Sequence, residues 1–184
     1  MNKKAAILAG AMVVGAASPA AALGLKYGAR LGTGITFPDP EPDGVDISVF
    51  AGGLGVLLDL AIIGIEIDAM YLRHSASKGD ATDSWIALPA LGRFNFPVIP
   101  AFLSLDFFAG LEYRLGIGAE AGGKDFGDDQ QSPLYLPVGI GGTLDLKIIQ
   151  LNLDMRYERQ LTAHSKGADD ARIHELLFMA GAFF

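Results

Sequence analysis

The sequence predicts an all-β fold, an eight-stranded antiparallel up-and-down transmembrane barrel, and three observations lead to that prediction. Apolar and polar residues alternate with period two in most of eight segments, which is typical of strands with two different faces. Short and long connections alternate along the chain, as they do in membrane barrels. The last segment also alternates, and because an open sheet edge is not tolerated in lipid, this strand must pair back to close the sheet.

The amino-terminal residues predict a secretory signal peptide. Lys3 and Lys4 precede a short apolar run, and small residues follow, with Ala20 and Ala22 at the positions typical of a cleavage site. The apolar run is too short for a comfortable membrane span, which makes a retained anchor the weaker alternative. We therefore divide the chain into a signal peptide, residues 1–22, and an outer-membrane β-barrel domain, residues 23–184.

Composition limits the possible classes of protein. The chain has no cysteine, which excludes disulfides, thiol chemistry and lipoprotein attachment. After cleavage, 162 residues remain, enough for one domain, with 12 basic and 21 acidic residues and a net charge of −9. An acidic chain is a poor partner for nucleic acid. The mean hydropathy of +0.34 is high for a charged soluble domain.

The predicted strands and their connections follow one another regularly. The strands are residues 23–37, 46–58, 62–73, 84–96, 101–116, 133–144, 148–161 and 172–184. Each has at least the ~9–11 residues that a tilted strand needs to cross a bilayer. Short turns are expected near residues 59, 97 and 146, and long loops near residues 41, 79, 125 and 166. This pattern predicts periplasmic turns and surface loops.

The first four strands differ in the clarity of their alternation. In the first, odd positions are almost all apolar, while even positions are glycine or polar and include Lys26 and Arg30. The second alternates poorly because both of its faces are apolar or glycine. The third alternates isoleucines with Glu66 and Asp68, and the fourth places Arg93 on its polar face. The polar faces are expected to point into the barrel.

The last four strands repeat this arrangement. The fifth strand carries Asp106, Glu112 and Arg114 on its polar face, and the sixth has apolar residues at its outward positions. The seventh carries Asp154, Arg156 and Glu158 on its polar face. The eighth places apolar residues at every second position back from the carboxyl end, including Phe178 and Phe184. This segment resembles the carboxy-terminal signal of bacterial outer-membrane barrels, which the assembly machinery reads.

Two local features compete with this interpretation. Residues 47–65 contain Asp59 as their only charge and resemble a transmembrane helix in a hydropathy scan, although four glycines weaken a helix there. Pro89 and Pro137 fall inside predicted strands, and each must remove a ladder hydrogen bond. We expect each proline to lie at a bulge or near the loop end of its strand.

Inward charges are the main candidate site. They comprise Lys26, Arg30, Glu66, Asp68, Arg93, Asp106, Glu112, Arg114, Asp154, Arg156 and Glu158. Enclosed charges must be paired, since isolated buried charge is costly. Asp68, Asp106 and Asp154 follow short turns at similar spacing and are expected at similar heights. An eight-stranded barrel barely holds its own side chains, so we expect a plugged lumen; a narrow polar conduit, helped by the glycines of the first strand, is the alternative.

Catalysis and ion binding are weaker hypotheses. His74, His164 and His174 lie near strand ends, but His74–Ser75 and His164–Ser165 are sequence neighbours that would point to opposite faces of a strand. We expect these histidines to be solvated at the rim, although His174 could meet Asp169 or Asp170. The acidic loops could bridge lipopolysaccharide through divalent cations or contact a partner, through Asp39, Glu41, Asp43, Asp125, Asp128 and Asp129. Their spacing matches no calcium-binding loop.

The chain resembles the outer membrane β-barrel domain (porin-like) family over its whole mature length. The resemblance lies in residues 151–157, 160–162 and 172–184, and in a proline-containing fourth strand at residues 86–94. One departure is Arg159-Gln160-Leu161-Thr162, where the family often has Gly-Leu-Thr. The resemblance implies a small eight-stranded barrel in a Gram-negative-type outer membrane, and its members mostly lack a defined biochemical role.

The expected function is therefore structural or surface-interacting. We expect a non-enzymatic monomer without cofactor or metal in the bacterial outer membrane. Its expected partners are outer-membrane lipid, lipopolysaccharide, the barrel assembly machinery and periplasmic chaperones, and nucleic acid is not among them. A narrow channel for small polar solutes and a lipid-modifying enzyme are the alternatives.

Overall fold

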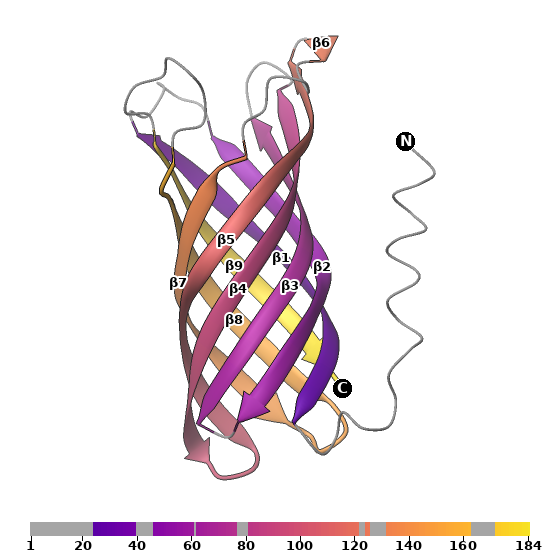
Figure 1. Ribbon diagram of the computed structural model, residues 1–184, viewed down its shortest axis with the longest axis vertical. Helices are drawn as coiled ribbons and strands as arrows, with labels where there is room; N and C mark the ends of the chain where they lie inside the picture. The colour runs from indigo at the N-terminus through magenta and orange to yellow at the C-terminus, as the bar shows by residue number, and fades with distance from the viewer. Residues whose placement is uncertain are drawn as a thin grey trace.

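The structure, a computed structural model, is a closed antiparallel barrel (Figure 1). It describes residues 24–39, 46–60, 62–76, 81–121, 124–125, 132–162 and 172–184. Within these ranges the wall strands are β1 (Leu25–Asp39), β2 (Ile47–Leu60), β3 (Ile63–Ala76), β4 (Thr82–Ile99), β5 (Leu103–Ala121), β7 (Leu134–Asp145), β8 (Gln150–Gln160) and β9 (Arg172–Phe183). The two-residue β6 (Lys124–Asp125) pairs only with the end of β5. The predicted signal peptide lies outside the described residues.

The predicted eight-stranded barrel is confirmed by the pairing of the strands. Each wall strand pairs with its neighbours in the sequence, and β1 pairs with β9 to close the sheet. The final residue takes part in closure, because Tyr27 N donates to Phe184 O at 3.0 Å and Phe184 N donates to Tyr27 O at 2.8 Å. The carboxyl end of the chain therefore leaves no open edge at this seam.

The two ends of the barrel differ in their connections. Short turns join β2 to β3, β4 to β5 and β7 to β8 at one end, where the carboxyl terminus also lies (Figure 1). The strand ends that the longer connections join, between β1 and β2, β3 and β4, β5 and β7, and β8 and β9, lie at the other end. In outer-membrane barrels the short turns are periplasmic and the long loops extracellular. We call these the short-turn end and the long-loop end.

Side chains alternate across the wall as predicted. On β3, Ile63, Ile65 and Ile67 are exposed on the outside, whereas Glu66 and Asp68 are buried inside. The same inward-outward alternation runs through β8 and β9. An apolar exterior and a polar interior are what a barrel in lipid requires.

The transmembrane-helix alternative for residues 47–65 is wrong. Apart from Ile62 in the turn, the described residues of this window belong to β2 and β3, which pair along their lengths from Ile47–Ala76 to Leu60–Ile63. Among the described residues, no helix has the length and apolarity to cross a bilayer. Glycine is unfavourable in a helix interior, whereas in this barrel Gly53 and Gly55 allow Met70 and Asp68 of the neighbouring strand to approach closely.

Several strands extend further than predicted at the long-loop end. β3 continues to Ala76 and β4 begins at Thr82, so the predicted loop at residues 74–83 is shorter than expected. β5 continues to Ala121 rather than to residue 116. The apolar pattern stops where the lipid stops, whereas backbone pairing continues beyond it, so hydropathy alone underestimates these strands.

The two prolines interrupt one ladder each without a bulge. Pro89 stays in register with Glu112 of β5, while the β3–β4 ladder passes from Ile67–Ala90 to Met70–Ala87 at constant register. Pro137 likewise pairs with Glu158 of β8, and the β5–β7 ladder is interrupted beside it. Neither proline lies at a bulge, but Pro137 lies near the long-loop end of β7, which is the other position that was expected. Pro89 lies mid-strand, so the expectation is wrong for it. The missing N–H of a proline removes a hydrogen bond only with the neighbouring strand that it would have faced, so the ladder with the other neighbouring strand continues.

Candidate functional site in the barrel lumen

The predicted inward charges all point into the barrel, and ten of the eleven are fully buried. Lys26 is the exception, with its side chain 23% exposed near the short-turn end. The other ten are at most 4% exposed, and they are Arg30, Glu66, Asp68, Arg93, Asp106, Glu112, Arg114, Asp154, Arg156 and Glu158. The strand alternation thus places them on one common inner surface, where pairing decides their energy.

One cluster of these charges, the Arg93 cluster, joins five strands. Arg93 Nη1 donates to Glu66 Oε2 at 2.7 Å, and Arg93 Nη2 donates to Asp154 Oδ1 at 2.9 Å. Arg30 Nη2 donates to the same Glu66 oxygen at 2.6 Å, and Arg30 also bonds to Asp154. Asp106 lies 3.4 Å from Arg93 Nη2. Two guanidinium groups therefore share two carboxylates between β1, β3, β4 and β8, which ties opposite sides of the barrel together.

The three aspartates expected at one height do not form a single group. Asp106 and Asp154 both contact Arg93, whereas Asp68 lies 3.8 Å from Arg30 Nε and 4.0 Å from Arg156 Nη2. Asp106 also accepts a hydrogen bond from Thr143. Asp68 and Asp154 both contact Arg30. Which arginine each aspartate meets depends on the shear of the barrel, and shear cannot be read from the spacing along one strand.

A second cluster, the Arg114 cluster, lies toward the long-loop end. Arg114 Nη1 and Nη2 each donate to Glu175 at 2.8 Å, and Arg114 Nε donates to Glu112 at 2.5 Å. Arg114 also bonds to Glu158, and its guanidinium carbon lies 3.7 Å from the ring centroid of Tyr135. One arginine thereby holds three carboxylates and stacks on an aromatic ring. Such bidentate, stacked geometry is specific to arginine.

Arg156 lies between the two clusters. Its nitrogens are 3.7 Å from Glu158, 3.8 Å from Glu66 and 4.0 Å from Asp68. None of these nitrogens has a hydrogen-bond partner among the described residues. The guanidinium groups of Arg93 and Arg156 lie 4.9 and 5.6 Å from the ring centroid of Phe108, so this inward phenylalanine contacts both arginines.

Two buried members of the Arg114 cluster were missed by the sequence-based prediction. Glu175 is 1% exposed, and its position in the alternation of β9 indicated an inward side chain. His74 was expected to be a solvated rim histidine, and that is wrong: it is 8% exposed, with Nε2 at 2.9 Å from Glu175 and Nδ1 at 2.7 Å from Asp83. His74 was hidden because its strand was predicted to end one residue earlier.

The lumen also contains an apolar cluster that was not predicted. It is contributed by β2, β3, β4 and β9, and every member is at most 2% exposed: Val49, Ala51, Met70, Leu72, Trp85, Ala87, Leu177 and Met179. The register places Leu72 opposite both Ala51 and Trp85. The interior is thus charged in one sector and apolar in another. The weak alternation of the second strand concealed the inward position of Val49 and Ala51.

Inward glycines make room for large side chains of the neighbouring strand. A Cβ at Gly28 would lie 2.7 Å from the ring of Phe183, and a Cβ at Gly32 would lie 2.1 Å from the sulfur of Met179. A Cβ at Gly141 would lie 2.1 Å from Asp154, and a Cβ at Gly139 would lie 2.4 Å from Phe108. These glycines therefore accommodate the filling of the lumen and do not widen it.

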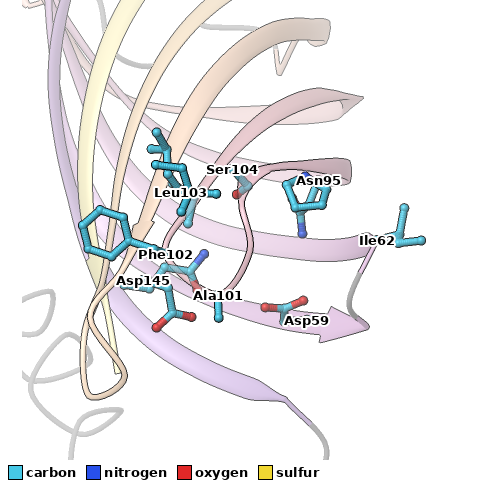
Figure 2. A pocket seen from close by; sticks show the side chains of 12 residues that line it. Asp59, Ile62, Asn95, Ala101, Phe102, Leu103, Ser104 and Asp145 are labelled. Atoms are coloured by element: carbon cyan, nitrogen blue, oxygen red, sulfur yellow. The ribbon is translucent and has the colours of Figure 1, made fainter.

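A pocket of about 230 Å³ opens at the short-turn end (Figure 2). Its lining includes Asp59, Asn95, Ser104 and Asp145 together with apolar residues such as Phe102. Nearby, Lys26 Nζ lies 3.2 Å from Asp59 and 3.8 Å from Asp145. At its inner side, Ser104 and Thr143 both bond to Asp106, so the pocket borders the Arg93 cluster.

The histidines do not form a nucleophile–base pair in the described residues. Both ring nitrogens of His74 face carboxylates. His174 stacks on Tyr157, with ring centroids 5.8 Å apart, and its Nδ1 is 2.5 Å from the tyrosine hydroxyl. His164, Asp169 and Asp170 lie outside the described residues. No group of three or more potential ligands suited to a metal ion occurs in the described part of the chain.

The acidic loop residues are mostly beyond what the structure describes. Glu41, Asp43, Asp128 and Asp129 lie outside the described residues, and for Asp39 and Asp125 only the backbone is described. Their expected role in ion or partner binding stays a prediction.

Solved structures with the same fold include several outer-membrane proteins. Neisserial surface protein A (NspA) has a TM-score of 0.67 and 14% sequence identity, over 87% of this chain and 96% of that one. The outer membrane enzyme PagL has a TM-score of 0.58 and 12% identity, over 83% and 97%. OprG from Pseudomonas aeruginosa has a TM-score of 0.52 and 12% identity, over 86% and 94%.

The likeness is one of fold, since the identities are low. No protein-family model and no curated protein sequence matches the chain. The similar structures include an enzyme as well as proteins that are not described as enzymes, so fold alone does not decide the activity. The chain therefore has the fold of the small eight-stranded outer-membrane β-barrel proteins.

Proposed function

We propose that this protein is a structural barrel of the bacterial outer membrane whose lumen is closed. One observation carries the proposal: inward glycines face large neighbouring side chains, so the width that an eight-stranded wall provides is filled from within. The charged clusters and the apolar cluster occupy different sectors of the same interior. A filled, cross-linked interior supports rigidity, and leaves the loops and the outer rim as the surfaces that contact other molecules.

The filled lumen favours this role over a narrow channel. The mouth pocket at the short-turn end borders Ser104 and Thr143, behind which lie the buried Asp106 and Arg93. A conducting path would have to pass this layer and then the Arg114 cluster. Both are held by ion pairs between strands that cannot separate without breaking the barrel ladder.

The histidine contacts favour the structural role over catalysis. PagL shares the fold and is an enzyme, which makes the enzyme hypothesis worth stating. Among the described residues, however, His74 and His174 contact carboxylates and a tyrosine and contact no serine. A nucleophile needs its base within hydrogen-bond reach, so these contacts support a non-catalytic barrel.

Planar-bilayer recordings of the refolded mature chain test the proposal. Only protein that migrates heat-modifiably on gels, as folded barrels do, is used, and a wide porin in the same bilayers serves as the positive control. The closed lumen predicts no reproducible single-channel steps. Stable steps whose size changes in Arg93→Gln or Asp106→Asn would contradict closure and establish the narrow channel.

The carboxyl end is proposed to direct assembly of a monomeric barrel by the assembly machinery, with periplasmic chaperones during transit. Phe184 pairs with Tyr27 through its backbone, and its side chain is 67% exposed on the outside, as is Phe178 at 52%. Deleting Phe184 removes its two hydrogen bonds with Tyr27, at the end of the seam, and the terminal aromatic. We expect the deletion to lower the level of folded protein in fractionated outer membranes. Phe102→Ala, which removes an aromatic side chain from a turn, is the control. An unchanged level after the deletion would disprove the role of Phe184 as an assembly signal.

A further inference from the structure

The charged side chains on the outward surface of the described strands lie at one end of the barrel, and most of them are arginines. They are Arg73, Glu120, Arg159 and Arg172, each exposed. All four lie within four residues of the long-loop end of their strands. Glu120, whose register partner Thr82 pairs with the outward Ser75, is the one carboxylate among the described outward strand side chains, although the mature chain has more acidic than basic residues.

Two of these arginines lie together on β8 and β9. Arg159 is the register partner of His174. Arg172 lies two residues before His174 on β9, toward the long-loop end and on the same outward face. Tyr157 lies one outward position below Arg159 and holds His174 Nδ1 at 2.5 Å, while the described residues place no partner on Nε2. We define Arg159, Arg172 and His174 as the basic rim.

The cations of the basic rim are not used within the described structure. Neither arginine forms an ion pair with a described residue, in contrast to the arginines of the lumen. On β7 the register partner of Arg159 is Leu136, and on β1 that of Arg172 is Asp39, of which only the backbone is described. Arg159 therefore has no carboxylate as its register partner on either neighbouring strand.

The position of the basic rim along the barrel wall indicates which ligand it can bind. Below it the outward face is apolar, through residues such as Met155 and Phe178, and Tyr157 occupies the position where aromatic residues meet a membrane interface. Exposed guanidinium groups one step beyond an aromatic girdle face the headgroups of the outer leaflet. Arginine binds phosphate with its planar fork of donors, and an imidazole N–H adds a further donor.

We propose that the basic rim binds the phosphate groups of an outer-leaflet phosphoglycolipid of the lipid A type. The site holds one headgroup against β8 and β9, with the acyl chains along the apolar face below. The proposal rests on the outer-membrane location proposed above, and it is independent of whether the lumen conducts.

Lipid retention in nanodiscs tests the basic rim. Refolded, heat-modifiable protein is placed in phosphatidylcholine nanodiscs with phosphorylated lipid A or with the same lipid after phosphatase treatment, and retained lipid is counted by native mass spectrometry. The wild type is expected to prefer the phosphorylated lipid by about tenfold, since charge-assisted hydrogen bonds to phosphate are lost without it. The double variant Arg159→Gln, Arg172→Gln should lose that preference.

Arg73→Gln is the matched control, because it removes the same charge from the same end of β3, three strands away from β9. It should keep the preference. Equal retention of both lipids by the wild type would overturn the proposal, as would an equal loss in Arg73→Gln, which would indicate general attraction. Displacement of the lipid by millimolar inorganic phosphate would assign the site to free phosphate instead. Any of these results, obtained with heat-modifiable protein, leaves the closed barrel unaffected.

Discussion

The charged and apolar sectors fill the same lumen through different kinds of interaction. In the charged sector, Arg114 pairs with Glu112, Glu158 and Glu175, so each side chain depends on specific partners. In the apolar sector, residues such as Leu72 and Trp85 fill space without a directional bond. Removing one partner of a buried ion pair in the charged sector should therefore be strongly destabilising. In the apolar sector, a substitution that conserves side-chain volume should be tolerated. The following predictions test that contrast.

Removing Arg114 should give the largest loss of stability. Arg114→Met leaves three buried carboxylates without their shared cation, and breaking a buried pair from one side costs about 3–5 kcal/mol. The free energy of unfolding is measured by urea titration of the protein in lipid vesicles. Arg159→Met on the exterior is the control and should change stability by about 0.5 kcal/mol or less. Similar values for the two variants would show that the charged cluster does not hold the barrel.

Truncation in the apolar sector should give a smaller loss that depends on volume. Leu72→Ala leaves a cavity beside Trp85 and should cost about 2–5 kcal/mol, whereas Leu72→Met conserves volume and should cost less than about 1.5 kcal/mol. The same urea titration measures both variants. If Leu72→Met were as damaging as Leu72→Ala, the apolar sector would depend on specific shape as strictly as the charged sector depends on pairing.

Replacing a wall glycine by alanine should give the smallest loss of stability, and the loss should depend strongly on position. A Cβ at Gly110 would lie 2.0 Å from the Ala90 carbonyl oxygen, whereas a Cβ at Gly118, further along β5, meets no atom within 4 Å. Gly110→Ala should cost about 1–3 kcal/mol through overpacking, and Gly118→Ala should be nearly neutral. Equal effects in thermal unfolding would mean that the wall relaxes freely, which contradicts a tightly filled interior.

The sequence was sufficient for the wall because the requirements of lipid act on single strands. Glu66 and Asp68 alternating with isoleucines already fixed which face of β3 points inward, and the terminal segment had to close the sheet. The strand ends were harder, because pairing beyond the membrane has no hydropathy signal; for this reason His74 was assigned to a loop and to solvent.

The pairing inside the lumen could not be derived from the sequence. Which carboxylate meets which arginine depends on the tilt and shear that bring distant strands together, as Arg93 of β4 and Asp154 of β8 are brought together. The apolar sector was missed for a different reason. Val49 and Ala51 lie on a strand with apolar residues on both faces, so the alternation did not indicate which face points into the barrel.

Thiol accessibility of single cysteines tests the central claim, closure of the lumen, most directly. The chain contains no natural cysteine, so each introduced thiol reports one position. Ala87→Cys lies in the apolar cluster with no exposed surface, and Ser104→Cys lines the mouth pocket at the short-turn end. In folded protein, a small charged thiol reagent should label Ser104→Cys and leave Ala87→Cys unlabelled until the barrel is unfolded. Rapid labelling of Ala87→Cys in heat-modifiable protein would contradict closure.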